Sequence, residues 1–149
     1  MARLERNIVI RAPVERVWRV LVDPVRSPDW EAGLVGVEDA NELLDSPAAS
    51  CIQVMSFRRQ TVQGEAEVVE AYAPHTRALR VQPPLTVSAM RRERLVETDE
   101  GTEITLELSY DTRGGPLGAL LDVALTRPRL AMMLAESLRN LRRLVESEP

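Results

Sequence analysis

Six short segments of β-type sequence follow one another between residues 34 and 112, separated by turn residues and without any helical pattern between them. Consecutive strands joined by short turns pair antiparallel, whereas parallel strands need long crossover connections. This stretch therefore predicts an antiparallel sheet and argues against alternating βαβ units. The expected strands are 34–42, 50–59, 62–73, 76–83, 86–98 and 102–112.

The last two of these strands form the clearest hairpin. Asp99-Glu100-Gly101 marks its turn, and Pro74-His75 and Pro83-Pro84 mark earlier turns. After the last turn apolar and polar side chains alternate, which is typical of a strand with one buried and one solvated face. The residues expected to face inward are Ile104, Leu106, Leu108 and Tyr110.

One more strand and two short helices are expected before this region. Residues 4–11 alternate and predict a half-buried strand. Pro13 suits the first turn of a helix, where its missing N–H costs nothing. This helix ends at Asp23-Pro24, because a residue before proline is pushed out of the α region. Ser27 and Pro28 suit the cap and the first position of a second, very short helix.

A long helical pattern closes the chain. It opens at Gly114-Gly115-Pro116 and continues to about Glu146. Pro128 lies inside it and should kink or briefly break the helix, because proline lacks a backbone N–H and clashes with the preceding turn. The apolar stripe of this helix consists of Leu130, Leu134, Leu138, Leu141 and Val145.

These elements together predict one α+β domain over residues 1–149. A chain of 149 residues suits a single hydrophobic core. The expected layout is a seven-stranded antiparallel sheet and a long C-terminal helix, with the two short helices after the first strand.

Charge and residue usage exclude several classes of function. The formal net charge is -4, and the arginine clusters at 91–94 and 139–143 lie close to acidic residues, so no nucleic-acid partner is expected. All 19 basic residues are arginine. Without lysine the chain has no side-chain amine for Schiff-base catalysis and no P-loop. It has no Gly-x-Gly-x-x-Gly run either, so we expect no cofactor.

The sequence also predicts a cytoplasmic protein without an integral membrane segment. The N-terminus has no long apolar run after its charges, so it does not resemble a secretory signal. The longest apolar piece, Leu117–Leu125, is interrupted by Asp122 and is far shorter than the ~18 residues of a membrane span. Cys51 is the only cysteine and cannot form an internal disulfide.

Compact catalytic or metal-binding arrangements are not evident. The single histidine, His75, lies in an expected turn and should be exposed to solvent. A zinc site needs several histidine or cysteine ligands, and only His75 and Cys51 are available. We therefore expect no metal, and no catalytic residue is identified.

The register of the last hairpin decides which charged residues face inward. Thr102 can pair with Thr98 or with Glu97, and a slip of one residue turns every side chain of a strand to the other face. Charged side chains face inward in both registers. Because burying an unpaired charge is costly, these residues must pair, reach a cavity mouth or contact a polar ligand group.

Pairing of Thr102 with Thr98 turns Arg92 and Arg94 inward, with Met90 and Val96 completing an apolar rim. We favour this register. Either arginine could then bind a carboxylate, phosphate or enolate, although an internal arginine–glutamate pair remains open. The other register turns inward Ala89, Arg91, Glu93 and Leu95.

Tyrosine, tryptophan and methionine supply further candidates for ligand contact. Tyr72 and Tyr110 could orient a ligand or act as acids, or they could be ordinary packing residues with solvated hydroxyls. Trp30, at the end of the short second helix, could lie at a cavity entrance. Methionines suit an adaptable apolar pocket, although they more often fill a core; the methionines considered are Met55, Met90, Met132 and Met133, and the expected ligand contacts among them are Met55, Met90 and Met133.

The order and spacing of these features resemble the START-like, birch-pollen-allergen-like superfamily (SRPBCC), and within it the polyketide cyclase/dehydrase group. The opening IVIRAPVERVWRVLVDPVRSPDW matches a strand, an Ala-Pro-x-x-x-Val-Trp helix and a short Pro-x-Trp helix. VVEAYAPHTRALRV resembles the central hairpin, ETDEGTEITLELSY the penultimate turn and SLRNLRRLVE the terminal helix. The resemblance covers nearly the whole chain.

This resemblance implies a helix-grip fold, in which the sheet wraps around the last helix and a cavity lies between them. It also implies binding of an apolar small molecule of the lipid, polyketide or isoprenoid type. The residues expected to contact it are Trp30, Met55, Tyr72, Met90, Arg92, Arg94, Leu106, Leu108, Tyr110, Leu121, Leu125 and Met133.

Three functions remain open on this basis, since fold alone does not fix function. The first is binding or carriage of the apolar molecule. The second is a polyketide aromatase/cyclase, in which the inward arginines and the tyrosines would position a poly-β-ketone and stabilise an enolate. The third is a partner-binding assembly module, which an exposed apolar patch would support. A homodimer is also left open.

Overall fold

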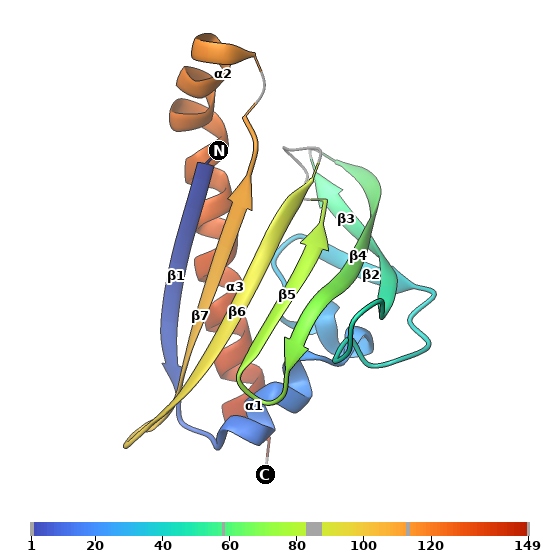
Figure 1. Cartoon of the computed structure of the whole chain (residues 1–149), viewed down its shortest axis with the longest axis vertical. Coiled ribbons are helices and arrows are strands. Elements are labelled where there is room, and N and C mark those ends of the chain that lie inside the picture. Colours follow the sequence, from blue (N-terminus) through green and yellow to red (C-terminus); the bar gives the residue numbers. More distant parts are fainter. Residues whose placement is uncertain (1, 58, 83–87, 113, 149) are drawn as a thin grey trace.

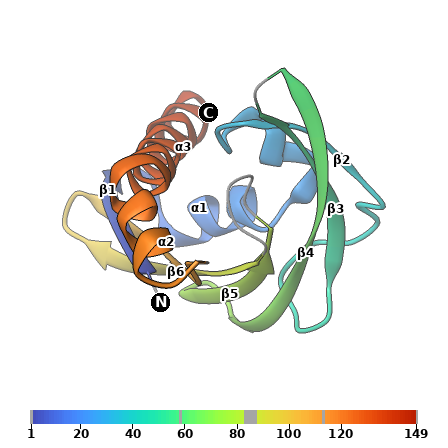
Figure 2. The same ribbon diagram turned by 90° about the horizontal axis from the view of Figure 1, so that it is seen from above.

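The computed structural model describes residues 2–57, 59–82, 88–112 and 114–148 and shows a curved sheet that wraps around one long helix (Figures 1 and 2). The sheet has seven strands in the order β1-β7-β6-β5-β4-β3-β2, and all neighbouring strands are antiparallel. The predicted fold class is confirmed. The elements are β1 (Ala2–Ile10), α1 (Val14–Leu21), η1 (Pro24–Asp29), β2 (Leu34–Glu38), β3 (Ser50–Phe57), β4 (Gln60–Tyr72), β5 (Thr76–Val81), β6 (Ala89–Thr98), β7 (Gly101–Tyr110), α2 (Gly115–Leu121), η2 (Asp122–Thr126) and α3 (Arg127–Ser147).

The short second helix begins four residues earlier than the sequence suggested. Asp23, not Ser27, caps it, because the Asp23 carboxylate accepts a hydrogen bond from the Val25 N–H at 3.1 Å. Pro24 takes the first helical position, and Ser27 becomes a buried residue inside the helix. The predicted turn at Pro83-Pro84 lies outside the described residues.

The C-terminal helical segment changes its winding just before Pro128. The five residues of η2 form a π-helix between α2 and α3. Pro128 has no N–H to donate to the carbonyl of Ala124, and a local π-turn relieves the clash that its ring would cause in a regular α-helix. The predicted interruption takes the form of this π-helical stretch.

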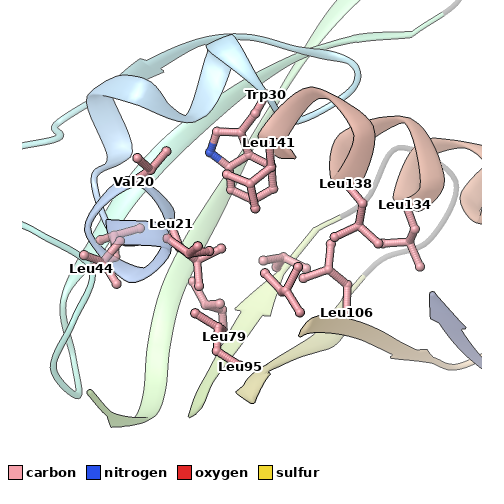
Figure 3. Packing of buried hydrophobic residues seen from close by; sticks show 14 of the residues in the cluster. Val20, Leu21, Trp30, Leu44, Leu79, Leu95, Leu106, Leu134, Leu138 and Leu141 are labelled. Carbon is pink, nitrogen blue, oxygen red and sulfur yellow. The ribbon is translucent and has the colours of Figure 1, made fainter. Parts of the chain in front are cut away.

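The inner face of the sheet and one stripe of α3 form the core. All five residues of the predicted stripe, from Leu130 to Val145, are buried. Figure 3 shows Leu134, Leu138 and Leu141 turned toward side chains of the sheet and of the segment that contains Trp30. The core therefore joins the helix, the sheet and the short N-terminal helices into one unit.

The register of the β6–β7 hairpin contradicts the one favoured from the sequence. Glu97 pairs with Thr102, and Thr98 pairs with Gly101, which leaves a two-residue turn. Gly101 has a φ of 142°, and a Cβ there would lie 2.2 Å from the Ile10 carbonyl oxygen. Only glycine fits this close approach, so the turn is fixed at this position.

This register places Arg92 and Arg94 on the outer face of the sheet, where both are exposed. Their prediction as inward-facing residues is therefore wrong. Arg91 and Glu93 face the inside instead, with Ala89 and Leu95. Burial of these two charges is tolerated because Glu93 pairs with Arg77 and Arg91 pairs with Glu31.

Tyr110 fixes the rotation of the helical segment that follows β7. Its Oη donates a hydrogen bond to Oδ1 of Asp122 at 2.8 Å, and both residues are buried. Burial first, and then the Asp122 carboxylate, raise the pKa of Tyr110 above its ordinary value. The hydroxyl therefore remains a proton donor to Asp122 at neutral pH.

Replacing Tyr110 by phenylalanine is expected to lower the free energy of unfolding by about 1–3 kcal/mol, because the buried Asp122 carboxylate loses its hydrogen-bond donor. Urea denaturation followed by circular dichroism measures this effect. Tyr72→Phe is the matched control, since Tyr72 is 64% exposed. Equal stability of both variants would show that the Tyr110–Asp122 bond contributes nothing.

Candidate ligand pocket between the sheet and the last helix

A small pocket lies between the inner face of the sheet and α3. Its volume is about 80 Å³. Strands β2, β3, β5, β6 and β7 contribute side chains to one side and α3 to the other, and the segment after η1 closes one end. The lining residues are Glu31, Ala32, Leu34, Gln53, Met55, Val81, Gln82, Arg91, Leu108, Leu130, Met133, Leu134 and Ser137.

Most of the pocket wall is apolar, whereas its polar groups come mainly from the segment after η1 and from two strands. Glu31, Gln53 and Arg91 carry the strongest hydrogen-bonding groups in the lining. Gln53 is buried, and Glu31 and Arg91 have side chains only 10% and 12% exposed. The arrangement matches the usual design of small-molecule sites, an apolar wall with a few placed polar groups.

Two hydrogen bonds hold the segment after η1 against α3. The Ser137 Oγ accepts a bond from the Ala32 N–H at 2.9 Å, and the Asn140 Nδ2 donates to the Trp30 carbonyl oxygen at 3.2 Å. Glu31 lies between these two attachment points in the sequence. Its carboxylate is therefore held in place next to the pocket.

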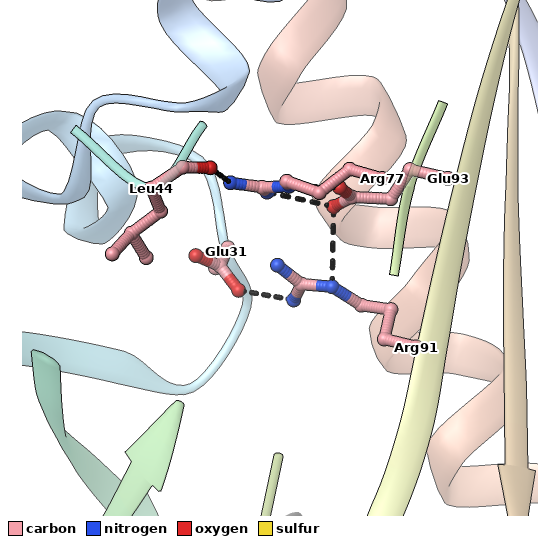
Figure 4. A network of polar contacts seen from close by, with 5 residues as sticks. All are labelled: Glu31, Leu44, Arg77, Arg91 and Glu93. Carbon is pink, nitrogen blue, oxygen red and sulfur yellow. Dashed lines mark hydrogen bonds and ion pairs between the residues drawn. The ribbon is translucent and has the colours of Figure 1, made fainter. Parts of the chain in front are cut away.

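A buried network of four charged residues runs behind the pocket wall (Figure 4). The Arg77 guanidinium donates two bonds to the Glu93 carboxylate, at 2.5 and 3.0 Å, and a third to the Leu44 carbonyl oxygen at 2.9 Å. The Arg77 and Glu93 side chains are 1% and 0% exposed. Such a bidentate pair satisfies both charges inside the core.

Arg91 links this buried pair to the pocket. Its Nη1 donates to Glu31, and its Nε forms an ion pair with Glu93 at 3.2 Å that lacks hydrogen-bond geometry. Its guanidinium also lies over the Trp30 ring, 5.9 Å from the centroid. The two arginines and two glutamates balance in charge, so the pocket end is polar but electrically neutral.

The pKa of Arg91 follows from these contacts. Burial alone would lower it, but the carboxylates of Glu31 and Glu93 more than offset that effect and raise the pKa above its ordinary value. Arg91 therefore remains a cation and a hydrogen-bond donor at neutral pH.

Cys51 lies near this network but is poorly suited to covalent chemistry. Burial, and then the charge of Glu31, raise the pKa of its thiol to about 11. A nucleophilic cysteine needs a thiolate, and such a pKa keeps nearly all of the thiol protonated at neutral pH.

Three of the predicted ligand contacts line the pocket: Met55, Leu108 and Met133. Leu106 is buried in the core but is not part of the lining, and Trp30, whose ring lies under the Arg91 guanidinium, is only 1% exposed and does not line the pocket either. Tyr110 uses its hydroxyl to hold Asp122. These three residues are buried but do not line the pocket.

Six predicted contacts lie away from the pocket. Tyr72, Met90, Arg92 and Arg94 sit on the outer face of the sheet, because they pair with residues that point outward. Leu121 and Leu125 are 49% and 63% exposed. The Tyr110–Asp122 bond turns the other side of their helix toward the body of the protein.

Sequence reasoning missed most of the polar lining. The alternation of Cys51, Gln53 and Met55 in β3 was a usable signal for Gln53, since all three are buried. Ser137 follows Leu130 and Leu134 at helical spacing on α3 and could have been found in the same way. Glu31 lies in an irregular segment, and no sequence pattern pointed to it.

Metal binding finds no support in the part of the chain that the structure describes, where no group of three potential ligands occurs. His75 lies in a turn, and its side chain is 54% exposed, 3.8 Å from the Glu97 carboxylate. None of the described helices is both long enough and apolar enough to cross a membrane.

Solved structures with similar folds cover almost the whole chain. A protein from Rhodobacter sphaeroides is 20% identical with a TM-score of 0.76, over 98% of this chain and 93% of the other. Ara h 8.0201 is 13% identical with a TM-score of 0.70, over 99% of each chain. DynU16, a putative protein in the dynemicin biosynthetic locus, is 19% identical with a TM-score of 0.69, over 97% of this chain and 47% of the other.

Identities this low show a shared fold, and they confirm the predicted helix-grip architecture. A search of curated proteins finds no match. A family model described as polyketide cyclase / dehydrase and lipid transport matches residues 1–146. The chain therefore belongs to the polyketide cyclase / dehydrase and lipid transport family.

Proposed function

We propose that the chain binds an apolar small molecule with a neutral oxygen group, such as a hydroxyl or a ketone, in the pocket beneath α3. The observation that carries this proposal is the combination of an apolar wall with the Glu31–Arg91 pair at the pocket. Family membership supports the same class of ligand.

The charge balance of the network favours a neutral polar group over an anion. A ligand carboxylate would compete with Glu31 and Glu93 for Arg91 and would place a third negative charge beside them. A hydroxyl can instead accept a hydrogen bond from Arg91 and donate one to Glu31 or Gln53. A ketone can use the donors of Arg91 and Gln53.

The size of the pocket limits the ligand. Sites for drug-sized ligands usually measure about 300–1,000 Å³, whereas this pocket measures about 80 Å³. A ligand larger than a short aliphatic chain must displace lining side chains. Met55 and Met133 are the residues best able to move, because methionine is unbranched and flexible. We therefore propose a ligand that enlarges the pocket as it binds.

Binding is better supported than cyclase catalysis. Glu31 and Arg91 are the ionisable side chains that line the pocket in the described structure, and they are bonded to each other. A cyclase would need further groups to move protons. Tyr72 and Tyr110, the acids suggested by the sequence, lie on the outer face and in the bond to Asp122.

The double variant Glu31→Gln/Arg91→Met is expected to bind a medium-chain alcohol about tenfold more weakly than the wild type. It removes the charged donor, whose hydrogen bond is worth about 1.5–3 kcal/mol, while the paired change avoids leaving Glu31 as an unpartnered charge. Isothermal titration calorimetry with the alcohol, the ketone and the carboxylic acid of equal chain length measures this effect.

Arg92→Met is the matched control, because Arg92 is the next residue in β6 and points to the outer face. It should bind all three ligands like the wild type. Tighter binding of the acid than of the alcohol by the wild type would contradict the preference for a neutral group. Unchanged alcohol affinity in the double variant would place the polar contact elsewhere.

A further inference from the structure

The helical segment 115–126, made of α2 and η2, exposes an unusual amount of apolar side chain. Leu117 and Leu120 are 66% and 64% exposed, and no residue of α2 is buried. In Figure 1 this segment projects beyond the end of the sheet, so the body of the protein does not cover it. The exposed large apolar residues in it are Leu117, Leu120, Leu121, Val123 and Leu125.

The polar residues of this segment face the protein. Asp122 and Thr126 are its only polar side chains. Asp122 is buried against Tyr110, and Thr126 lies one helical turn further on the same side and is half-buried. The rest of the helix circumference presents only leucine, valine, alanine, proline and glycine to solvent. A surface helix normally has the opposite arrangement.

Basic residues flank this apolar surface. Within four residues of the segment on either side, the sequence contains three arginines and one acid, Asp111. Arg127 and Arg129 follow the segment directly and are exposed. Arg127 donates to the Arg3 carbonyl oxygen at 2.9 Å, which fixes it at the base of the projecting helix. Positive charge at the base of an apolar tip complements anionic lipid headgroups.

The pocket lies next to this segment along the same helix. Leu130, Met133 and Leu134, which line the pocket, begin four residues after Thr126. The pocket therefore lies within about two helical turns of segment 115–126, so an apolar molecule released next to this segment would be close to the pocket.

We propose that segment 115–126 inserts into the surface of an anionic lipid bilayer and that the pocket exchanges its ligand there; the exchange, though not the insertion, rests on the proposed function. A bilayer surrounds a projecting helix on all of its exposed sides, whereas a second copy of the chain would cover one stripe. The segment is about 18 Å long, which suits the interface of a bilayer but not a crossing of its ~30 Å core.

The test uses the full chain and vesicles of phosphatidylcholine with or without phosphatidylglycerol. Flotation should recover the wild type with the anionic vesicles, and the triple variant Leu117→Gln/Leu120→Gln/Leu121→Gln should bind them at least tenfold more weakly. The matched control is Val25→Gln/Val35→Gln/Val69→Gln, which removes exposed valines elsewhere and should bind like the wild type. High salt should weaken wild-type binding.

Absence of wild-type flotation, or equal loss in both triple variants, would overturn the insertion. A dimer in sedimentation analysis that the leucine variant alone abolishes would assign the surface to self-association and overturn it as well. Alcohol binding in solution separates this proposal from the proposed function. The leucine variant should bind the alcohol with wild-type affinity, so a loss of vesicle binding alone identifies the membrane contact. Failure of the wild type to bind the alcohol would refute the proposed ligand pocket but not the membrane insertion.

Discussion

Replacing Arg77 by alanine is expected to lower the free energy of unfolding by about 3–5 kcal/mol, because it leaves a buried carboxylate without its main partner. Glu93 is 0% exposed and receives two hydrogen bonds from Arg77. The Leu44 carbonyl oxygen also loses its donor. Urea or guanidinium denaturation at neutral pH measures the change.

Arg80→Ala provides the control within the same strand. Arg80 pairs with Glu67 at 2.8 Å, but its side chain is 56% exposed, so its loss should cost less than about 1 kcal/mol. The double variant Arg77→Met/Glu93→Leu should recover much of the lost stability, because it removes both buried charges together. Equal effects of Arg77→Ala and Arg80→Ala would contradict the buried network.

Replacing Ala32 by leucine is expected to weaken binding of the medium-chain alcohol about thirtyfold. The isobutyl side chain takes up space in a pocket of about 80 Å³ that the ligand would otherwise occupy. Each buried CH₂ of the ligand that it displaces costs about 0.8 kcal/mol, so two to three such groups account for the loss. Calorimetric titration gives the affinity.

Ala124→Leu is the control for this variant, since Ala124 is exposed on η2 and does not line the pocket. It should bind the alcohol with wild-type affinity in solution. Both variants should unfold within about 1.5 kcal/mol of the wild type, because the new side chain of Ala32→Leu enters empty space. Unchanged binding by Ala32→Leu would show that the alcohol binds outside the pocket.

The sheet and the long helix could be predicted because their strands, turns and apolar stripe have local signals. The alternation in β7 and the heptad-like stripe of α3 identify the faces that must be buried, and the turn residues separate the strands. The register of β6 has no such signal. Both registers placed two charged residues on the inner face, so the charges alone could not distinguish them. The deciding partner is Arg77, which lies on the neighbouring strand β5 and contacts Glu93 only in the folded sheet.

The candidate site was harder to predict, because it depends on side chains from distant elements. Glu31 reaches Arg91 only because Ser137 and Asn140 hold the segment after η1 against α3. Leu121 and Leu125 were among the residues expected to contact the ligand. The bond from Tyr110 to Asp122 fixes the opposite rotation of their helix, and a contact between one strand and one helix turn has no periodic signature.

The central claim is that an apolar ligand occupies the pocket beneath α3, and the methionines of the chain report on this directly. The experiment is a titration of ¹³C-methyl-methionine-labelled protein with the medium-chain alcohol, followed by NMR. Met55 and Met133 line the pocket, whereas Met132 is 70% exposed and Met90 lies on the outer face. We predict saturable shifts of the Met55 and Met133 methyl signals with Met90 and Met132 unmoved. Shifts confined to Met90 or Met132, or no shift at all, would contradict the account.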